Sequence, residues 1–281
     1  MILFGPSGNS LSFTAEGYSK TEQAAAWVKA RGLDCFEYSF GRGVNMGEEK
    51  AVAIGRAFSD AGVEISVHAP YYINFATTEA DKAENSYRYV LDSAKMASLM
   101  GGGRVIFHPA AQGKQTRESA VNLTLTRLKT LCEYVYANSL EHLYYCPETM
   151  GKLGQIGTVE EIAEFCKVDK IFIPAVDFGH INAREQGSLK TEEDYGQRLD
   201  YLISELGFER MKHFHVHFSK IQYSEKGEVR HLTFEDTKYG PDFAPLAAAL
   251  KKRGLEPFIV CESAGTQAED AAEMKRLYFS L

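Results

Sequence analysis

The chain has 281 residues, of which 44% are hydrophobic and 25% are charged. This is the composition of an ordinary globular protein with enough residues for a large core, and it excludes an intrinsically disordered chain. The formal net charge of −7 argues against broad nonspecific binding of nucleic acid, unless metal ions neutralise several of the carboxylates.

The sequence carries no sign of secretion or of a membrane segment. No apolar run approaches the roughly 20 residues that span a bilayer. The N-terminal stretch "MILFGPSGNS" lacks the basic start and the cleavage region of a signal peptide. The five cysteines form no CxxC pair, which fits a reducing compartment better than a disulfide framework. We therefore expect a cytoplasmic protein without a membrane partner.

Short β-branched or aromatic runs recur along the chain and predict eight strands. In chain order they cover residues 1–6, 35–40, 63–70, 104–109, 142–148, 171–178, 213–218 and 257–262. Stretches with apolar residues at helical spacing follow each strand, at residues 21–32, 47–62, 78–101, 116–138, 158–167, 191–207, 243–254 and 268–279. The first two of these stretches end on Gly32 and Gly62, which are typical helix stop signals.

This alternation of strands and helices predicts a single (β/α)8 TIM barrel, one α/β domain that covers residues 1–281. An open, doubly wound sheet is the alternative. A dinucleotide-binding sheet of that kind would carry the fingerprint G-x-G-x-x-G after its first strand. The stretch "GPSGNS" at residues 5–10 has two glycines and does not match it. We therefore expect a barrel that uses no nucleotide cofactor.

Histidines and carboxylates stand at the predicted ends of six successive strands. They are separated by about one strand–helix unit each: His68, His108, Glu148, Asp177, His217 and Glu262. His180 follows Asp177 by three residues. Taken singly, each of these residues could be a rim, cap or turn residue. Together, in phase with the strands, they favour one site at the C-terminal mouth, where barrel enzymes do their chemistry.

The residue types at these strand ends suit a divalent transition metal. Imidazoles and carboxylates without a nearby thiolate favour zinc, manganese or iron. The set exceeds what one tetrahedral ion needs, and a carboxylate can bridge two ions, as in the two-metal sites of phosphoryl transfer. His213, His215 and His217 share one face of the seventh predicted strand by alternation. Because His217 alone stands at the C-terminal end, we interpret His213 and His215 as core or packing residues.

Six stretches make the chain resemble the endonuclease IV family of apurinic/apyrimidinic DNA-repair nucleases, within the xylose-isomerase-like TIM-barrel superfamily. They are "VHAPYYINFA" (67–76), "FHPA" (107–110), "ETMGKLGQIGT" (148–158), "DFGH" (177–180), "VHFSK" (216–220) and "IVCES" (259–263). Their order and spacing agree with that family. The segment after Glu148 differs from the family's commonest glycine-rich version, which indicates a divergent branch.

The resemblance implies a cluster of two or three Zn²⁺ ions, with Mn²⁺ or Fe²⁺ as alternatives. His68 and His108 would hold one ion, and Glu148 would bridge it to a second. The remaining ligands of the second ion would be Asp177, His217 and Glu262. Glu148 and Glu262 would also be the catalytic pair that orients the attacking hydroxide.

The same resemblance implies a third ion, held by His180 and by His231 in "VRHLTF". The family has an aspartate two residues before this second histidine, whereas this chain has Val229. Glu228 next to it is a candidate substitute, and Asp236 is a weaker one. Whether the third site is filled stays open at this point.

The resemblance also implies contacts with DNA. Tyr71 falls where the family places an aromatic side chain in the damaged duplex; packing of Tyr71 or Tyr72 on the barrel rim is the alternative. Arg42 could reach into the stack beside an extruded abasic sugar. Asn74 is expected to support the loop backbone and to reach a phosphate. Lys220 is either a phosphate contact or a solvated lysine.

We therefore expect a hydrolase, a metal-dependent endonuclease that acts as a monomer in base excision repair. It would cut the phosphodiester 5′ to abasic sites in double-stranded DNA. One alternative is a metal-dependent sugar isomerase or epimerase on the same barrel, and another is a noncatalytic binder of damaged DNA. The number of histidines favours a multinuclear nuclease over a sugar enzyme with a single ion.

Overall fold

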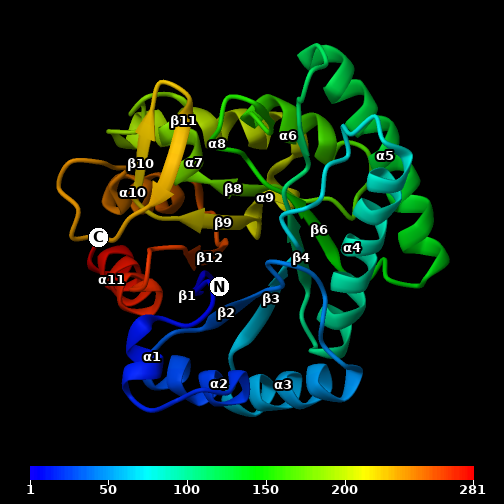
Figure 1. Cartoon of the computed structure of the whole chain (residues 1–281). Helices are drawn as coiled ribbons and strands as arrows, with labels where there is room; N and C mark the ends of the chain where they lie inside the picture. Colours follow the sequence, from blue (N-terminus) through cyan, green and yellow to red (C-terminus); the bar gives the residue numbers. More distant parts are fainter.

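Eight short parallel strands alternate with helices along the chain and form the ring seen in Figure 1. The computed structural model describes residues 1–281. The strands of the ring are β1 (Leu3–Pro6), β2 (Cys35–Ser39), β3 (Glu64–His68), β4 (Arg104–Phe107), β6 (Tyr144–Pro147), β8 (Ala175–Asp177), β9 (His215–Phe218) and β12 (Phe258–Cys261). Each lies within one of the predicted strands. Runs such as "FIVC" in β12 are apolar at every position because barrel strands are buried on both faces.

The ring consists of two four-stranded parallel sheets that meet at two seams. One sheet has the order β2-β3-β4-β6, and the other has the order β1-β12-β9-β8. A parallel bridge between Ser7 and Glu37 joins β1 to β2, and bridges that include Glu148 to Ala175 join β6 to β8. The ring is therefore closed, which confirms the predicted TIM barrel and rules out the open, doubly wound sheet.

The eight predicted helices lie outside the ring (Figure 1). They are α2 (Thr21–Ala30), α3 (Glu48–Ala61), α4 (Ala80–Leu99), α5 (Arg117–Ala137), α6 (Val159–Cys166), α8 (Glu192–Leu206), α10 (Phe243–Arg253) and α11 (Gln267–Ser280). Helix α3 ends at Gly62 as expected, because this glycine adopts the left-handed conformation with φ of +63°. None of the helices combines the length and the apolar composition that crossing a membrane requires.

Several short elements in the connections are not predicted from the sequence. They are α1 (Leu11–Ala15), α7 (Phe178–Arg184), α9 (Phe208–Lys212), β5 (Ala110–Ala111), β7 (Gln155–Ile156), β10 (Ile221–Ser224) and β11 (Gly227–His231). The strand expected at residues 171–178 is shorter than predicted. Its regular pairing begins after Pro174, which has no N–H to donate, and ends at Asp177, whose carboxylate caps α7.

The interior of the ring holds a few polar side chains in an otherwise apolar core. Glu37, His215 and His217 are completely buried there. His215 stacks on Phe258 with ring centroids 5.3 Å apart, so its interpretation as a packing residue is confirmed. The same interpretation is wrong for His213, which is exposed because it lies in the turn before β9 and not within the strand.

Candidate metal centre

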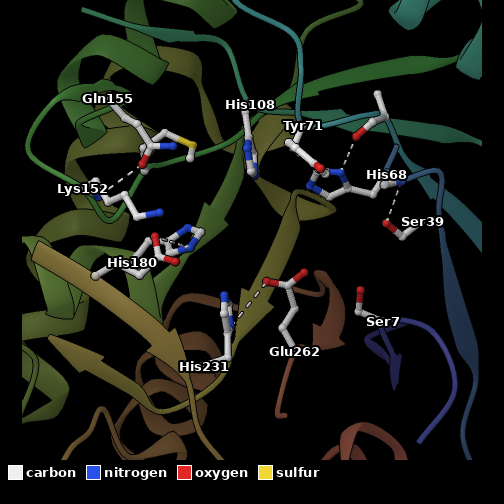
Figure 2. A pocket seen from close by; sticks show the side chains of 14 residues that line it. Ser7, Ser39, His68, Tyr71, His108, Lys152, Gln155, His180, His231 and Glu262 are labelled. Carbon is white, nitrogen blue, oxygen red and sulfur yellow. Dashed lines mark hydrogen bonds and ion pairs between the residues drawn. The ribbon is translucent and has the colours of Figure 1, made fainter. Parts of the chain in front are cut away.

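The residues expected at the strand ends lie at one mouth of the barrel, because parallel strands present their C-terminal ends to the same side. In Figure 2, the side chains of His68, His108 and Glu262 turn toward a common pocket, and His180 and His231 border it on another side. Three groups of histidines and carboxylates with spacing suitable for metal ions occur in this region.

The first group consists of His68, His108 and Glu148, which lie at the C-terminal ends of the neighbouring strands β3, β4 and β6. The Nε2 atoms of both imidazoles lie 3.2 Å from Oε2 of Glu148. Glu148 is buried, whereas the His108 side chain is partly open to the pocket. The two imidazoles therefore converge on one oxygen of a buried carboxylate.

The second group uses the other oxygen of the same carboxylate. It consists of Glu148, Asp177, His217 and Glu262. Nδ1 of His217 lies 3.1 Å from Oε1 of Glu148 and 3.7 Å from Oε2 of Glu262. Glu148 thus belongs to both groups, with one oxygen facing each.

One buried oxygen in the second group has no hydrogen-bond partner. It is Oδ2 of Asp177. Nδ1 of His180 lies 3.3 Å away, but its ring N–H is directed at the carbonyl of Thr149 at 2.9 Å. A buried carboxylate oxygen without a donor is strongly unfavourable, and a divalent cation bound by the group would satisfy it. The donors present therefore fit a metal ion.

The third group consists of His180 in α7 with Glu228 and His231 in β11. Nε2 of His180 lies 3.4 Å from Oε2 of Glu228. Residues three apart in a regular strand face opposite sides. The hairpin β10–β11 has a register shift in which Val229 has no partner, so this extra residue returns Glu228 to the side of His231. Val229 itself is half exposed.

Two histidines are oriented by backbone carbonyls. Nδ1 of His68 lies 2.8 Å from the carbonyl of Ala69, and Nδ1 of His180 contacts the carbonyl of Thr149. A neutral imidazole carries one N–H, so donation from Nδ1 leaves the lone pair on Nε2. In both residues Nε2 faces a carboxylate of its group, which is the orientation that a metal ligand needs.

Burial and neighbouring charges shift the titration of these groups in opposite directions. Burial alone would raise the pKa of Glu148, but the imidazoles of His217 and His108 hold the pKa of this carboxyl well below its usual range. Burial would lower the pKa of His68, but its hydrogen bond with Glu148 raises that pKa to about 9. Burial raises the pKa of Asp177. Cations bound by these groups would compete with protons for the same nitrogen and oxygen atoms.

The residues expected to contact DNA differ in their surroundings. Tyr71 lines the pocket and is 51% exposed, and its ring lies 4.5 Å from that of Tyr72, centroid to centroid. Arg42 is exposed in the loop after β2. Oδ1 of Asn74 accepts hydrogen bonds from the backbone N–H groups of Ala76 in its own loop and of Ala111 in β5. Tyr71 and Arg42 are therefore free to meet a ligand, whereas the amide oxygen of Asn74 supports the loops.

Lys220 and Asp236 hold a loop and do not belong to the pocket. Nζ of Lys220 donates to the carbonyl of Asp236 at 2.6 Å, and its side chain is 13% exposed. The alternative of a solvated lysine is therefore wrong, whereas the phosphate contact expected for Lys220 stays a prediction. The carboxylate of Asp236 accepts N–H groups of its own loop, so the weaker candidate for the third group is wrong as well. The carboxylate that stands in that group is Glu228.

The pocket at the mouth has a volume of about 240 Å³ and includes residues that the sequence does not single out. Among them are Ser7, Ser39, Lys152 and Gln155. The exposed side chain of Lys152 extends toward the pocket near His180 (Figure 2). Its position within "ETMGKLGQIGT" is the signal that could have identified it, since it is the one cation in the segment after Glu148.

A family model described as the xylose isomerase-like TIM barrel matches residues 25–278. The chain is 30% identical over 263 residues to the uncharacterized protein MJ0133 of Methanocaldococcus jannaschii, covering 94% of this chain and 92% of that protein. It is 24% identical over 162 residues to the probable endonuclease 4 of Ureaplasma parvum serovar 3, covering 56% of this chain and 52% of that protein.

Solved structures share the barrel at low sequence identity. The structure of an L-ribulose 3-epimerase has a TM-score of 0.72 at 15% identity and covers 100% of this chain and 95% of that one. Endonuclease IV from Thermus thermophilus has a TM-score of 0.62 at 18% identity and covers 92% of this chain and 93% of that one. At these identities the likeness shows the fold alone. The match to the family model is what places the sequence: the chain belongs to the xylose isomerase-like TIM-barrel family.

Proposed function

We propose that the chain is a metal-dependent endonuclease that hydrolyses the phosphodiester 5′ to abasic sites in duplex DNA. The supporting observation is that three donor groups adjoin one another at one mouth. Glu148 belongs to the first two groups, and His180 lies 3.3 Å from Glu148 and 3.4 Å from Glu228 in the third. Such a set suits several adjacent ions, which is the arrangement used in hydrolytic phosphoryl transfer.

Bound divalent ions would supply Lewis acidity and a low-pKa water at the mouth. The chain itself contributes two carboxylates with different access. Glu148 is 1% exposed and suits a bridging role, whereas Glu262 is 19% exposed and lines the pocket. Glu262 is therefore the carboxylate that can hold the attacking water and accept its proton.

The rim of the pocket offers contacts suited to a nucleic acid. Tyr71 and Tyr72 form an exposed aromatic pair on which a base beside the lesion can stack. Lys152 places a positive charge at the pocket for a phosphate. An abasic nucleotide has no base to unstack or unpair, so it swings out of the helix at low cost.

A sugar isomerase or epimerase is the second candidate, favoured by the full-length likeness to the fold of an L-ribulose 3-epimerase. The second group alone offers three carboxylates and one imidazole, which suffice for a single ion. A sugar isomerase or epimerase with a single ion would not use the first and third groups. For this reason we rank the endonuclease first.

The decisive experiment measures nicking of a labelled duplex with one abasic site by protein loaded with Zn²⁺ or Mn²⁺. We expect products with a 3′-hydroxyl and a 5′-deoxyribose phosphate. Glu262→Gln should slow nicking by about 100-fold or more, because the proton acceptor is lost. Glu235→Gln is the matched control, since Glu235 is exposed and outside the three groups. Equal rates for Glu262→Gln and the parent would refute the assigned role.

The same preparations should be incubated with ketopentoses and ketohexoses in deuterated water. Isomer formation or exchange of a carbon-bound proton without nicking would establish the sugar enzyme instead. Tight binding of the abasic duplex that stays uncut under full metal loading would establish a noncatalytic binder.

A further inference from the structure

A second polar cluster lies inside the barrel, behind the metal centre. It consists of Glu37 on β2 with His215 and His217 on β9, and all three side chains are completely buried. The two strands belong to different sheets, so the cluster crosses the interior of the ring. The proposed reaction assigns no role to Glu37 or His215.

His217 connects this cluster to the metal centre through its two ring nitrogens. Nδ1 faces Glu148 at 3.1 Å and Glu262 at 3.7 Å. Nε2 faces the interior and lies 3.0 Å from Oε1 of Glu37. One imidazole therefore stands between the carboxylates of the mouth and the carboxylate of the core.

The other oxygen of Glu37 is held in place by the core. Oε2 accepts a hydrogen bond from Oγ of Ser66 at 2.9 Å and lies 3.2 Å from Nε2 of His215. His215 is in turn stacked on Phe258. Because these contacts fix Oε2, Oε1 stays directed toward His217.

The chemistry of imidazole decides what this arrangement does. A metal ion in the second group needs the Nδ1 lone pair of His217, so the single proton of the neutral ring must reside on Nε2. Nε2 of His217 and Oε1 of Glu37 are both buried and lack any hydrogen-bond partner. They lie 3.0 Å apart, so Glu37 is the acceptor that a small rotation of the ring would give to the Nε2 proton. A carboxylate at this place fixes both the tautomer and the ring orientation of a ligating histidine.

We infer that Glu37 is a positioning residue that accepts the Nε2 proton of His217 and thereby presents Nδ1 to an ion in the second group. The inference rests on the proposed function, because it takes the second group to bind metal. It goes beyond that proposal by extending the metal site into the barrel interior, to a residue on β2.

Metal affinity tests this role without reference to DNA. Co²⁺ binding is measured by competition with a chromophoric chelator for the parent, Glu37→Leu and Glu37→Gln. Glu37→Leu should weaken one ion by about 10–100-fold. The Co²⁺ affinity of Glu37→Gln should lie between those of the parent and Glu37→Leu, since the glutamine amide oxygen still accepts a hydrogen bond. Cys35→Ala is the matched control on the same buried strand, because Cys35 contacts the carbonyl of Ile259 and not His217.

A spectroscopic readout separates positioning from general damage to the core. In Zn²⁺-loaded protein labelled with ¹⁵N-histidine, long-range ¹H–¹⁵N spectra should show His217 protonated at Nε2 and ligated at Nδ1. This measurement on the parent and on Glu37→Gln stands even if Glu37→Leu does not fold. The d–d spectrum of bound Co²⁺ should change in the Glu37 variants and stay unchanged in Cys35→Ala.

The possible outcomes distinguish this inference from the proposed function. Parent-like affinity and an unchanged His217 signal in both Glu37 variants overturn the positioning role and leave the endonuclease standing. A second result also overturns the positioning role: the parent binds an ion among Glu37, His215 and His217, and the Glu37 variants lose that ion. In that case Nε2 of His217 would be a metal ligand and would carry no proton. A parent that binds no divalent ion at all overturns both proposals together.

Discussion

Val229 is the unpaired residue of the bulge in β11, and it determines which carboxylate reaches the third group. In a regular strand, Glu228 and His231 would face opposite sides, because they are three positions apart. With the bulge, a glutamate three positions before the histidine lies where an aspartate two positions before it would lie in a regular strand. The bulge and the longer side chain thus compensate for the missing aspartate.

The first prediction concerns Glu228. Glu228→Gln should weaken the ion in the third group by about 10-fold or more, because a neutral amide is a poor ligand for a divalent cation. Val229→Asp should not change the number of bound ions, since residue 229 faces solvent. Bound metal is counted by mass spectrometry after gel filtration. An unchanged count in Glu228→Gln would show that the third group does not bind metal in this way.

The second prediction concerns Lys152. Its positive charge lies at the pocket, so Lys152→Gln should raise KM for an abasic duplex by about 10-fold with a smaller change in kcat. Lys82→Gln is the control, because Lys82 on α4 is exposed and pairs with Glu79, which precedes the helix. If kcat falls and KM stays constant, Lys152 does not serve substrate binding.

At the scale of elements, the hairpin β10–β11 packs directly on the segment that follows Glu148. Gly227 has φ of +91°, and a Cβ atom there would come 2.2 Å from the carbonyl oxygen of Gly151. The backbones of the two segments can approach this closely because residue 227 has no side chain. The hairpin that carries Glu228 and His231 is held against the mouth by this contact.

Gly227→Ala should therefore displace the hairpin and release the third ion, while the first two groups keep theirs. Gly17→Ala is the control, because Gly17 has a similar φ of +89° but open space where a Cβ would stand. Both variants are expected to lose about 1 kcal/mol of stability from the unfavourable φ, and Gly227→Ala should lose more because its Cβ meets the carbonyl oxygen of Gly151. Metal counting and chemical denaturation distinguish them. Equal metal content in the two variants would contradict the role of this contact.

The start of α6 yields a prediction about pH. The carboxylate of Glu161 accepts N–H groups of Gly157 and Thr158 at 2.7 and 2.9 Å and binds the guanidinium of Arg117 at 2.6 Å. Burial would raise the pKa of Glu161, but these partners lower it below 4.5. Because the folded pKa lies below the unfolded one, the stabilisation is complete above pH 4.5 and is lost as the pH falls through the folded pKa.

Glu161→Gln should accordingly lower the free energy of unfolding by about 1–3 kcal/mol at pH 7. The difference from the parent should shrink as the pH falls below 4.5. Denaturant titrations at pH 7 and at pH 3.5 measure it. If the difference in the free energy of unfolding between parent and Glu161→Gln grew toward acid pH, the stabilisation would not come from the ionised carboxylate of Glu161.

The regular elements follow from local signals, whereas the connections do not. Apolar runs and a stop at Gly62 suffice to place the strands and helices, and the strand count in turn places residues such as His68 at one mouth. The hairpin β10–β11 is short and polar, so its sequence does not differ from a loop. The role of Lys220 depends on the course of the loop around Asp236, and Glu37 appears in sequence as one polar residue within "CFEYSF". Such contacts arise from tertiary structure alone.

At the scale of the whole molecule, the candidate metal centre lies across one seam of the barrel. The first group comes from the sheet β2-β3-β4-β6. In the other sheet, Asp177 ends β8, His217 lies within β9 and Glu262 directly follows β12. The two sheets meet at β6 and β8 through isolated bridges. Ions bound here would therefore link the two halves of the ring. They would also neutralise the clustered carboxylates of Glu148, Asp177 and Glu262.

Removal of metal should consequently destabilise the entire barrel. An ion present at about 1,000 times its Kd adds about 4 kcal/mol to the stability of the folded state. For a chain of this size we expect chelation to lower Tm by about 10 °C. Scanning calorimetry with and without EDTA measures the change, and Zn²⁺ added back should restore it. An identical Tm in both conditions would argue against ions at the seam.

The two oxygens of Glu148 face different donor groups. An ion bound at one oxygen would replace the contact of Glu148 with the imidazoles of that group and leave the other oxygen turned toward its own group. Filling of the two positions should then be cooperative, and half-loaded molecules should be scarce. When less metal is added than the sites can hold, most molecules would have either both positions filled or neither. The activity of such a preparation would then measure the fraction of molecules with both positions filled.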